Sequence, residues 1–146
     1  MNIEKAIMQL KYQIKLLKSM VNYDEFPFFM YALDFEFEET QVNALLKIIL
    51  AFDYRLNHSS DNVYHNYHEL NKDDETLKTL LKTYQIDTYE IYKTELPSIS
   101  EFKHYLNCIF ADKEINAKHI ILSLKGQSIH KELCDYLLNQ LEEHKS

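Results

Sequence analysis

Glycine and proline are nearly absent from this chain, which has one glycine and two prolines in 146 residues. Glycine supplies the positive-φ positions that tight hairpins need, and glycine with proline punctuates most loops. Their scarcity excludes a fold built on many sharp turns and favours long helices, because 46% of the residues are apolar and can form a core. It also excludes glycine-rich phosphate loops and nucleophile elbows.

Cysteines are few, and long apolar runs and an excess of positive charge are absent. Cys108 and Cys134 are too few for the disulfide framework of a small secreted domain. Polar residues recur through the first twenty positions, so we expect no signal peptide, no membrane span and a cytoplasmic protein. A net charge of −7 argues against a general nucleic-acid binder, since phosphate affinity comes mainly from clustered Lys and Arg.

The first predicted helix carries a heptad seam of apolar residues spaced alternately by four and three. Its members are Ile3, Ile7, Leu10, Ile14, Leu17 and Val21. One interpretation is a homodimer, because β-branched residues at the a positions with leucine at d favour two parallel strands. The other is packing on the protein's own core, since Ala6, Leu16 and Met20 widen the apolar face. Three heptads is the lower limit for a coiled coil, so packing on the core is our expectation.

The rest of the chain predicts further helices. Pro27 opens a short aromatic helix, and an acidic connector follows over residues 34–39. Residues 40–56 predict a central helix, apolar on most sides, with Ile49 in the core. A polar insertion is predicted around residues 57–96, within which residues 86–95 are either helix or strand. The capping-box spacing of Asp87 and Glu90 favours helix there.

Helices are also expected near residues 102–110, 116–124 and 128–141, with Asn116 and Ser128 as N-caps and Gly126 as a C′ glycine. The sequence therefore predicts an all-α fold. We expect a single domain over residues 1–146, a compact bundle of six to seven helices.

Histidine and cysteine spacing offers candidates for chemistry. A metal site could form from His58, Asp61, His65, His68 and Glu69, whose side chains suit zinc or manganese. The alternative is a polar loop that happens to contain histidines, since these spacings match no fixed ligand motif.

Two cysteines lie four residues from a histidine on a predicted helix, as His104 with Cys108 and His130 with Cys134. Either pair could hold an activated thiol, or the cysteines could be buried and inert. We expect no catalytic residue, no metal and no cofactor.

The charges are segregated along the chain. Lys11, Lys15 and Lys18 share one face of the first helix, whereas residues 24–39 hold six acidic residues and no basic one. Such segregation can steer a protein partner or a second copy of the chain. We therefore predict a protein–protein interaction or regulatory module that self-associates or binds a protein partner. Its candidate contacts are Lys11, Lys15, Lys18, Phe26, Phe28 and Phe29.

Two alternative functions stay open at this point. The last two predicted helices, joined by residues 125–128, resemble a helix-turn-helix, which would make the chain a nucleic-acid-binding regulator. Glu132 and Asp135 on the second of them would repel phosphates. The other alternative is a metal-dependent or thiol enzyme.

The order of these segments resembles that of a known family. A helix ending in residues 16–24, then Phe26-Pro27-Phe28-Phe29, then a helix with acidic residues at its start near residue 38, is similar to the YhaI-like family of small, uncharacterised bacterial helical proteins. Residues 102–141 resemble that family's closing helices. The family has no established activity, so the resemblance implies only an all-helical, cytoplasmic, self-associating bacterial protein. Residues 57–96 have no counterpart in it, and residues 34–37 replace a glycine-containing turn.

Overall fold

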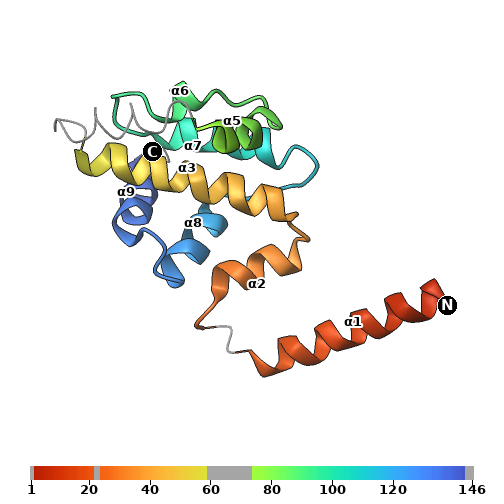
Figure 1. The fold of residues 1–146 in the computed structure, drawn as a ribbon. Helices are drawn as coiled ribbons and strands as arrows, with labels where there is room; N and C mark the ends of the chain where they lie inside the picture. Colours follow the sequence, from red (N-terminus) through yellow and green to blue (C-terminus); the bar gives the residue numbers. More distant parts are fainter. Residues whose placement is uncertain (1, 22–23, 59–73, 144–146) are drawn as a thin grey trace.

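The computed structural model describes residues 2–21, 24–58 and 74–143, and the secondary structure of these residues is entirely helical (Figure 1). Eight helices lie in this part of the chain, which confirms the all-α fold class with more helices than the six to seven predicted. They are α1 (Ile3–Met20), α2 (Pro27–Asp34), α3 (Glu39–His58), α5 (Glu75–Lys82), α6 (Thr88–Ile91), α7 (Ile99–Ile109), α8 (Ala117–Gly126) and α9 (Lys131–Glu143).

Helix α3 runs through the middle of the body and contacts α5, α6, α7 and α9 (Figure 1). Ala44, Ile48, Ile49, Ala51 and Phe52 are completely buried along it. A helix that is apolar on most sides must be covered on most sides, and that is its position here. The predicted central helix is thus confirmed.

Two glutamine side chains satisfy backbone groups at helix ends. Gln127 Oε1 accepts hydrogen bonds from the backbone N–H groups of Phe28, at 2.9 Å, and Phe29, at 3.0 Å, at the start of α2. Gln41, which is buried, accepts from Glu38 N at 2.9 Å and donates to the Ile109 carbonyl at 3.0 Å. The first turn of a helix has no intrahelical acceptors for its N–H groups, so Gln127 holds α2 against the end of α8. The hydrogen bond from Gln41 to Ile109 holds α3 against the end of α7.

The single glycine has a different role from the one predicted. Gly126 is the last residue of α8 and has no positive φ, whereas Ser128 adopts the left-handed conformation with φ 60°. A Cβ at Gly126 would lie 2.9 Å from Pro27 Cγ, so glycine permits the close approach of α2 to α8. The prediction of Ser128 as an N-cap is wrong, because α9 begins only at Lys131.

Part of the predicted polar insertion contributes to the core. Leu77 and Leu81 of α5 and Ile91 of α6 are buried against α3. Residues 86–95 contain the helix α6 in place of a strand, and the Asp87 side chain caps it by accepting from Tyr89 N at 2.9 Å. Residues 59–73 lie outside the described part of the chain.

Helix α1 stands apart from the body (Figure 1). None of its residues is buried, so the expectation that its seam packs on the protein's own core is wrong. The helices of the body pack on one another instead of on the seam: α2 packs on α8, and α8 packs on α7 and α9.

Candidate functional site

The exposed seam of α1 is the feature of this structure that most needs a functional explanation. Five of its residues lie in the helix and the sixth, Val21, is the C-cap, with an extended backbone. All six are between 38% and 71% exposed, namely Ile3, Ile7, Leu10, Ile14, Leu17 and Val21. Single apolar residues on a surface are ordinary, but a continuous stripe of them marks a surface that binds something.

Local contacts define the ends of α1. The Asn2 side chain caps the first turn by accepting from Lys5 N at 3.2 Å. Glu4 in the first turn and Lys18 in the last both complement the helix dipole. These features fix where the helix starts and stops, while its apolar seam contributes nothing to the core of the body.

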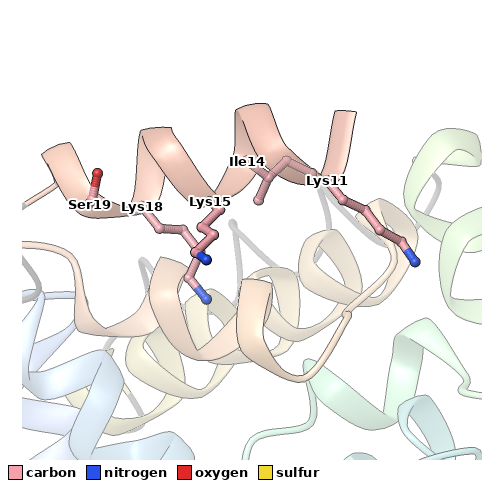
Figure 2. Close-up of a pocket in the computed structure, with 5 residues that line it drawn as sticks. All are labelled: Lys11, Ile14, Lys15, Lys18 and Ser19. Atoms are coloured by element: carbon pink, nitrogen blue, oxygen red, sulfur yellow. The ribbon is translucent and has the colours of Figure 1, made fainter. Parts of the chain in front are cut away.

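A lysine face borders the seam. Lys11, Lys15, Lys18, Ile14 and Ser19 line a shallow hollow of about 490 Å³ on α1 (Figure 2). Lys18 Nζ also lies 2.6 Å from Asp34 Oδ1 of α2, and this exposed ion pair joins the end of α1 to the body. The structure thus brings together the three predicted lysines, next to an apolar residue of the seam.

The predicted phenylalanines divide into two groups. Phe26 and Phe29 are exposed, and their rings stack with centroids 6.2 Å apart. Phe28 is completely buried in the core, so it is removed from the candidate contacts. The reason is the helical geometry of α2, which turns Phe28 toward the body while Phe29 faces solvent.

A second, more apolar hollow of about 280 Å³ lies where α1 meets α2. Its lining residues are Val21, Phe26, Phe29, Met30 and Leu33. We define the α1 seam and this hollow together as the docking surface. Sequence reasoning missed Leu33, since spacing alone does not tell which side of a short aromatic helix α8 covers.

Neither cysteine has the surroundings of an activated thiol. Burial raises the pKa of the Cys108 thiol, although His104 Nε2 lies 3.8 Å from its sulfur. Burial, reinforced by the charge of Asp135, raises the pKa of Cys134 to about 12, and Cys134 Sγ donates to the Ile129 carbonyl at 3.4 Å. A raised pKa keeps both groups protonated near neutral pH, whereas nucleophilic thiols need a lowered one.

Metal-ligating side chains do not cluster in the described ranges, where no group of three or more His, Cys, Asp or Glu could hold an ion. His65 and His68, with Asp61 and Glu69, lie outside the described residues. His130 Nδ1 lies 3.3 Å from Asp53 Oδ2, joining the α8–α9 connection to α3. This contact supplies two ligands, fewer than the three or four protein ligands of a zinc site.

The α8–α9 pair has few features of a nucleic-acid interface. Lys125 Nζ lies 2.6 Å from Asp135 Oδ1, so the positive charge of this lysine is neutralised within the pair. Leu133, Cys134 and Leu137 of α9 are buried in the body. Phosphate binding needs uncompensated Lys and Arg side chains, and Glu132 adds a further negative charge to α9.

Comparison of the chain with family models, with curated proteins and with solved structures gave no match. The resemblance to the YhaI-like family therefore stays a prediction from the sequence. Among the described helices, none is long and apolar enough to cross a membrane. The cytoplasmic location likewise stays a prediction.

Proposed function

We propose that this chain is a protein-interaction module that binds a helical partner through α1. The observation that carries the proposal is an 18-residue helix with an apolar seam and no buried residue. The compact body would then serve to anchor this helix and to place the docking surface at its base.

Helix energetics support this proposal. Isolated helices shorter than about 12–15 residues are marginal in water even when rich in alanine, and most helical stability in proteins comes from tertiary packing. Helix α1 contains one alanine and three isoleucines, and isoleucine loses side-chain freedom in a helix. A partner that covers the seam would supply the missing packing.

The lysines of α1 indicate which charge the partner should carry. Glu4 is the only acidic residue of α1, against Lys5, Lys11, Lys15 and Lys18. A helix that covers the seam therefore gains where it places an acidic residue beside one of these lysines, because opposite charges beside an apolar seam select the partner.

Photo-crosslinking in cells of the native host tests this proposal. A benzoylphenylalanine residue replaces Leu10, which lies in the seam, or Gln9, which lies outside it on the same helix. We expect the substituted position 10 to give protein adducts on illumination and position 9 to give few or none. Equal labelling at both positions, or no adduct at either, would contradict the proposal. Mass spectrometry of the adducts identifies what covers the seam.

A further inference from the structure

The seam of α1 is suited to a two-stranded assembly. In heptad terms, Ile7, Ile14 and Val21 occupy a positions, while Leu10 and Leu17 occupy d positions together with Ile3. In parallel coiled coils, β-branched residues at a with leucine at d favour two strands over three or four. Every one of these residues is exposed in the single chain, so all six are free to pack against another helix.

The residues beside the seam determine whether the second helix runs parallel or antiparallel to the first. The e positions are Glu4, Lys11 and Lys18, and the g positions are Ala6, Gln13 and Met20. In a parallel pair, e faces g of the other helix, so both lysines face uncharged residues and no opposite charges meet. In an antiparallel pair, e faces e, which puts Glu4 beside Lys18 of the second copy at each end of the pair, where the Lys18 ammonium also pairs with Asp34 of its own chain.

The same antiparallel arrangement aligns the whole seam. Ile7 then shares a layer with Leu17 of the second copy and Leu10 with Ile14, while Ile3 meets Val21, the extended C-cap of the second helix, so that every contact along the seam is apolar. Its flanks also match at the g positions, where Ala6 meets Met20. The arrangement contains one pair of like charges, Lys11 with Lys11 at the centre. It contains two pairs of opposite charges, Glu4 with Lys18 at each end.

Contacts beyond the helix favour this arrangement as well. Ile3 of the second copy would end at Val21, which lines the 280 Å³ hollow with Phe26, Phe29 and Leu33. The first half of one α1, which holds Lys5 and Lys11 against Glu4, would then lie near the acidic segment 24–39 of the other copy. Burial of the hollow adds apolar contact to a seam that is short for a coiled coil.

We infer that a second copy of this chain covers α1, and that the two α1 helices pair antiparallel. This inference rests on the proposed function and names the partner. A membrane surface is less well matched, because a helix that lies in a bilayer interface needs a strongly polar outer face. The outer face of α1 mixes the polar residues Lys5, Gln9, Lys15 and Ser19 with Met8, Tyr12 and Leu16, whose exposed fractions are 70%, 55% and 39%.

Light scattering of the full-length chain after gel filtration, over a range of protein concentrations, tests the inference. We expect the mass of two chains at high concentration, and at least a tenfold weaker dimer for Ile14→Asp. The matched control is Gln9→Asp, which adds the same charge to α1 outside the seam and should leave the dimer unchanged. Thermal melting of each variant checks that the body stays folded.

Disulfide trapping tests the direction of the two helices. In a Cys108→Ser background, chains with Ile7→Cys are mixed with chains carrying Leu17→Cys and then oxidised. Antiparallel pairing gives a mixed disulfide between the two variants, and neither variant alone gives a disulfide dimer. Parallel pairing gives the opposite result, because residue 7 then faces residue 7.

Other results would contradict the dimer or the direction of its helices. Disulfides between two Ile7→Cys chains overturn the antiparallel direction, and a mass of three chains overturns the pair. A monomer at every concentration overturns self-association, as does a monomer that binds phosphatidylglycerol vesicles through α1. If the chain is monomeric while the substituted position 10 still gives adducts with another protein, this inference fails and the proposed function stands.

Discussion

Arg55 and Glu101 form a paired contact inside the body, in which the two terminal guanidinium nitrogens of Arg55 donate to the two carboxylate oxygens of Glu101 at 2.8 and 2.9 Å. Arg55 is completely buried. Its Nε donates to the Glu95 carbonyl at 2.9 Å and its Nη1 to the Ile91 carbonyl at 3.3 Å. One side chain of α3 thus fixes the end of α6, the segment after it and the start of α7.

Loss of the carboxylate should be strongly destabilising. Glu101→Ala leaves a buried guanidinium without its counter-charge, and breaking a buried ion pair from one side costs about 3–5 kcal/mol. Urea denaturation should therefore show a decrease of that size in the free energy of unfolding.

The control for this pair replaces both charges. In Arg55→Met with Glu101→Leu no charge is left unpaired, and replacing a buried pair by apolar residues is often neutral. The double variant should unfold at a higher urea concentration than Glu101→Ala. The same midpoint for both would show that the ion pair is not the source of the effect.

Sequence patterns predicted helices more reliably than they predicted what those helices contact. The spacing of Ile49 and its neighbours was enough to identify the central helix, because an element apolar on most sides has to be enclosed. Arg55 also stands out in the sequence, because it is the only arginine and lies between Phe52 and Leu56 of that helix. Its partner, 46 positions away, depends on tertiary packing.

The position of α1 could not be predicted for a related reason. An apolar seam has the same spacing whether it packs on its own core or on another chain, so the pattern of Ile7, Leu10 and Ile14 fits both. The outcome depends on how fully the other helices fill the core. For the same reason the sequence does not separate Phe28 from Phe26 and Phe29 as a contact, although only Phe26 and Phe29 are exposed.

Removal of the Gln127 side chain should weaken the attachment of α2. Gln127→Leu leaves two N–H groups at the start of α2, those of Phe28 and Phe29, without their acceptor. Loss of a helix cap costs about 0.5–2 kcal/mol, so thermal or urea unfolding should show a decrease in that range. Gln127→Glu is the control, because a carboxylate still accepts both hydrogen bonds and suits the positive end of the helix dipole. Equal losses in both variants would contradict a capping role.

Alkylation should distinguish the two cysteines. In the native protein at pH 8, iodoacetamide should modify Cys108 slowly and Cys134 hardly at all, since Cys134 is buried and its pKa is raised to about 12. Thiolate is the reactive form, so the rate at Cys134 should stay low until the pH approaches that value or the protein unfolds. Mass spectrometry of the modified peptides measures both rates, with urea-unfolded protein as the reference. Fast modification of Cys134 at pH 8 would revive the thiol-enzyme alternative.

The same substitution in two helices should separate the core from the docking surface. Ile49→Asp buries a charge where Ile49 is completely enclosed, and we expect it to cost more than about 4 kcal/mol, a large share of the roughly 5–15 kcal/mol that stabilises a domain. Ile14→Asp places the charge where the side chain is 44% exposed, so the free energy of unfolding of the body should change by no more than about 0.5 kcal/mol. Urea unfolding at low protein concentration, where self-association contributes least, measures both.

A soluble Ile49→Asp variant that melts cooperatively near the wild-type temperature would show that α3 is not the core. A large loss in Ile14→Asp would show that α1 packs on the body after all.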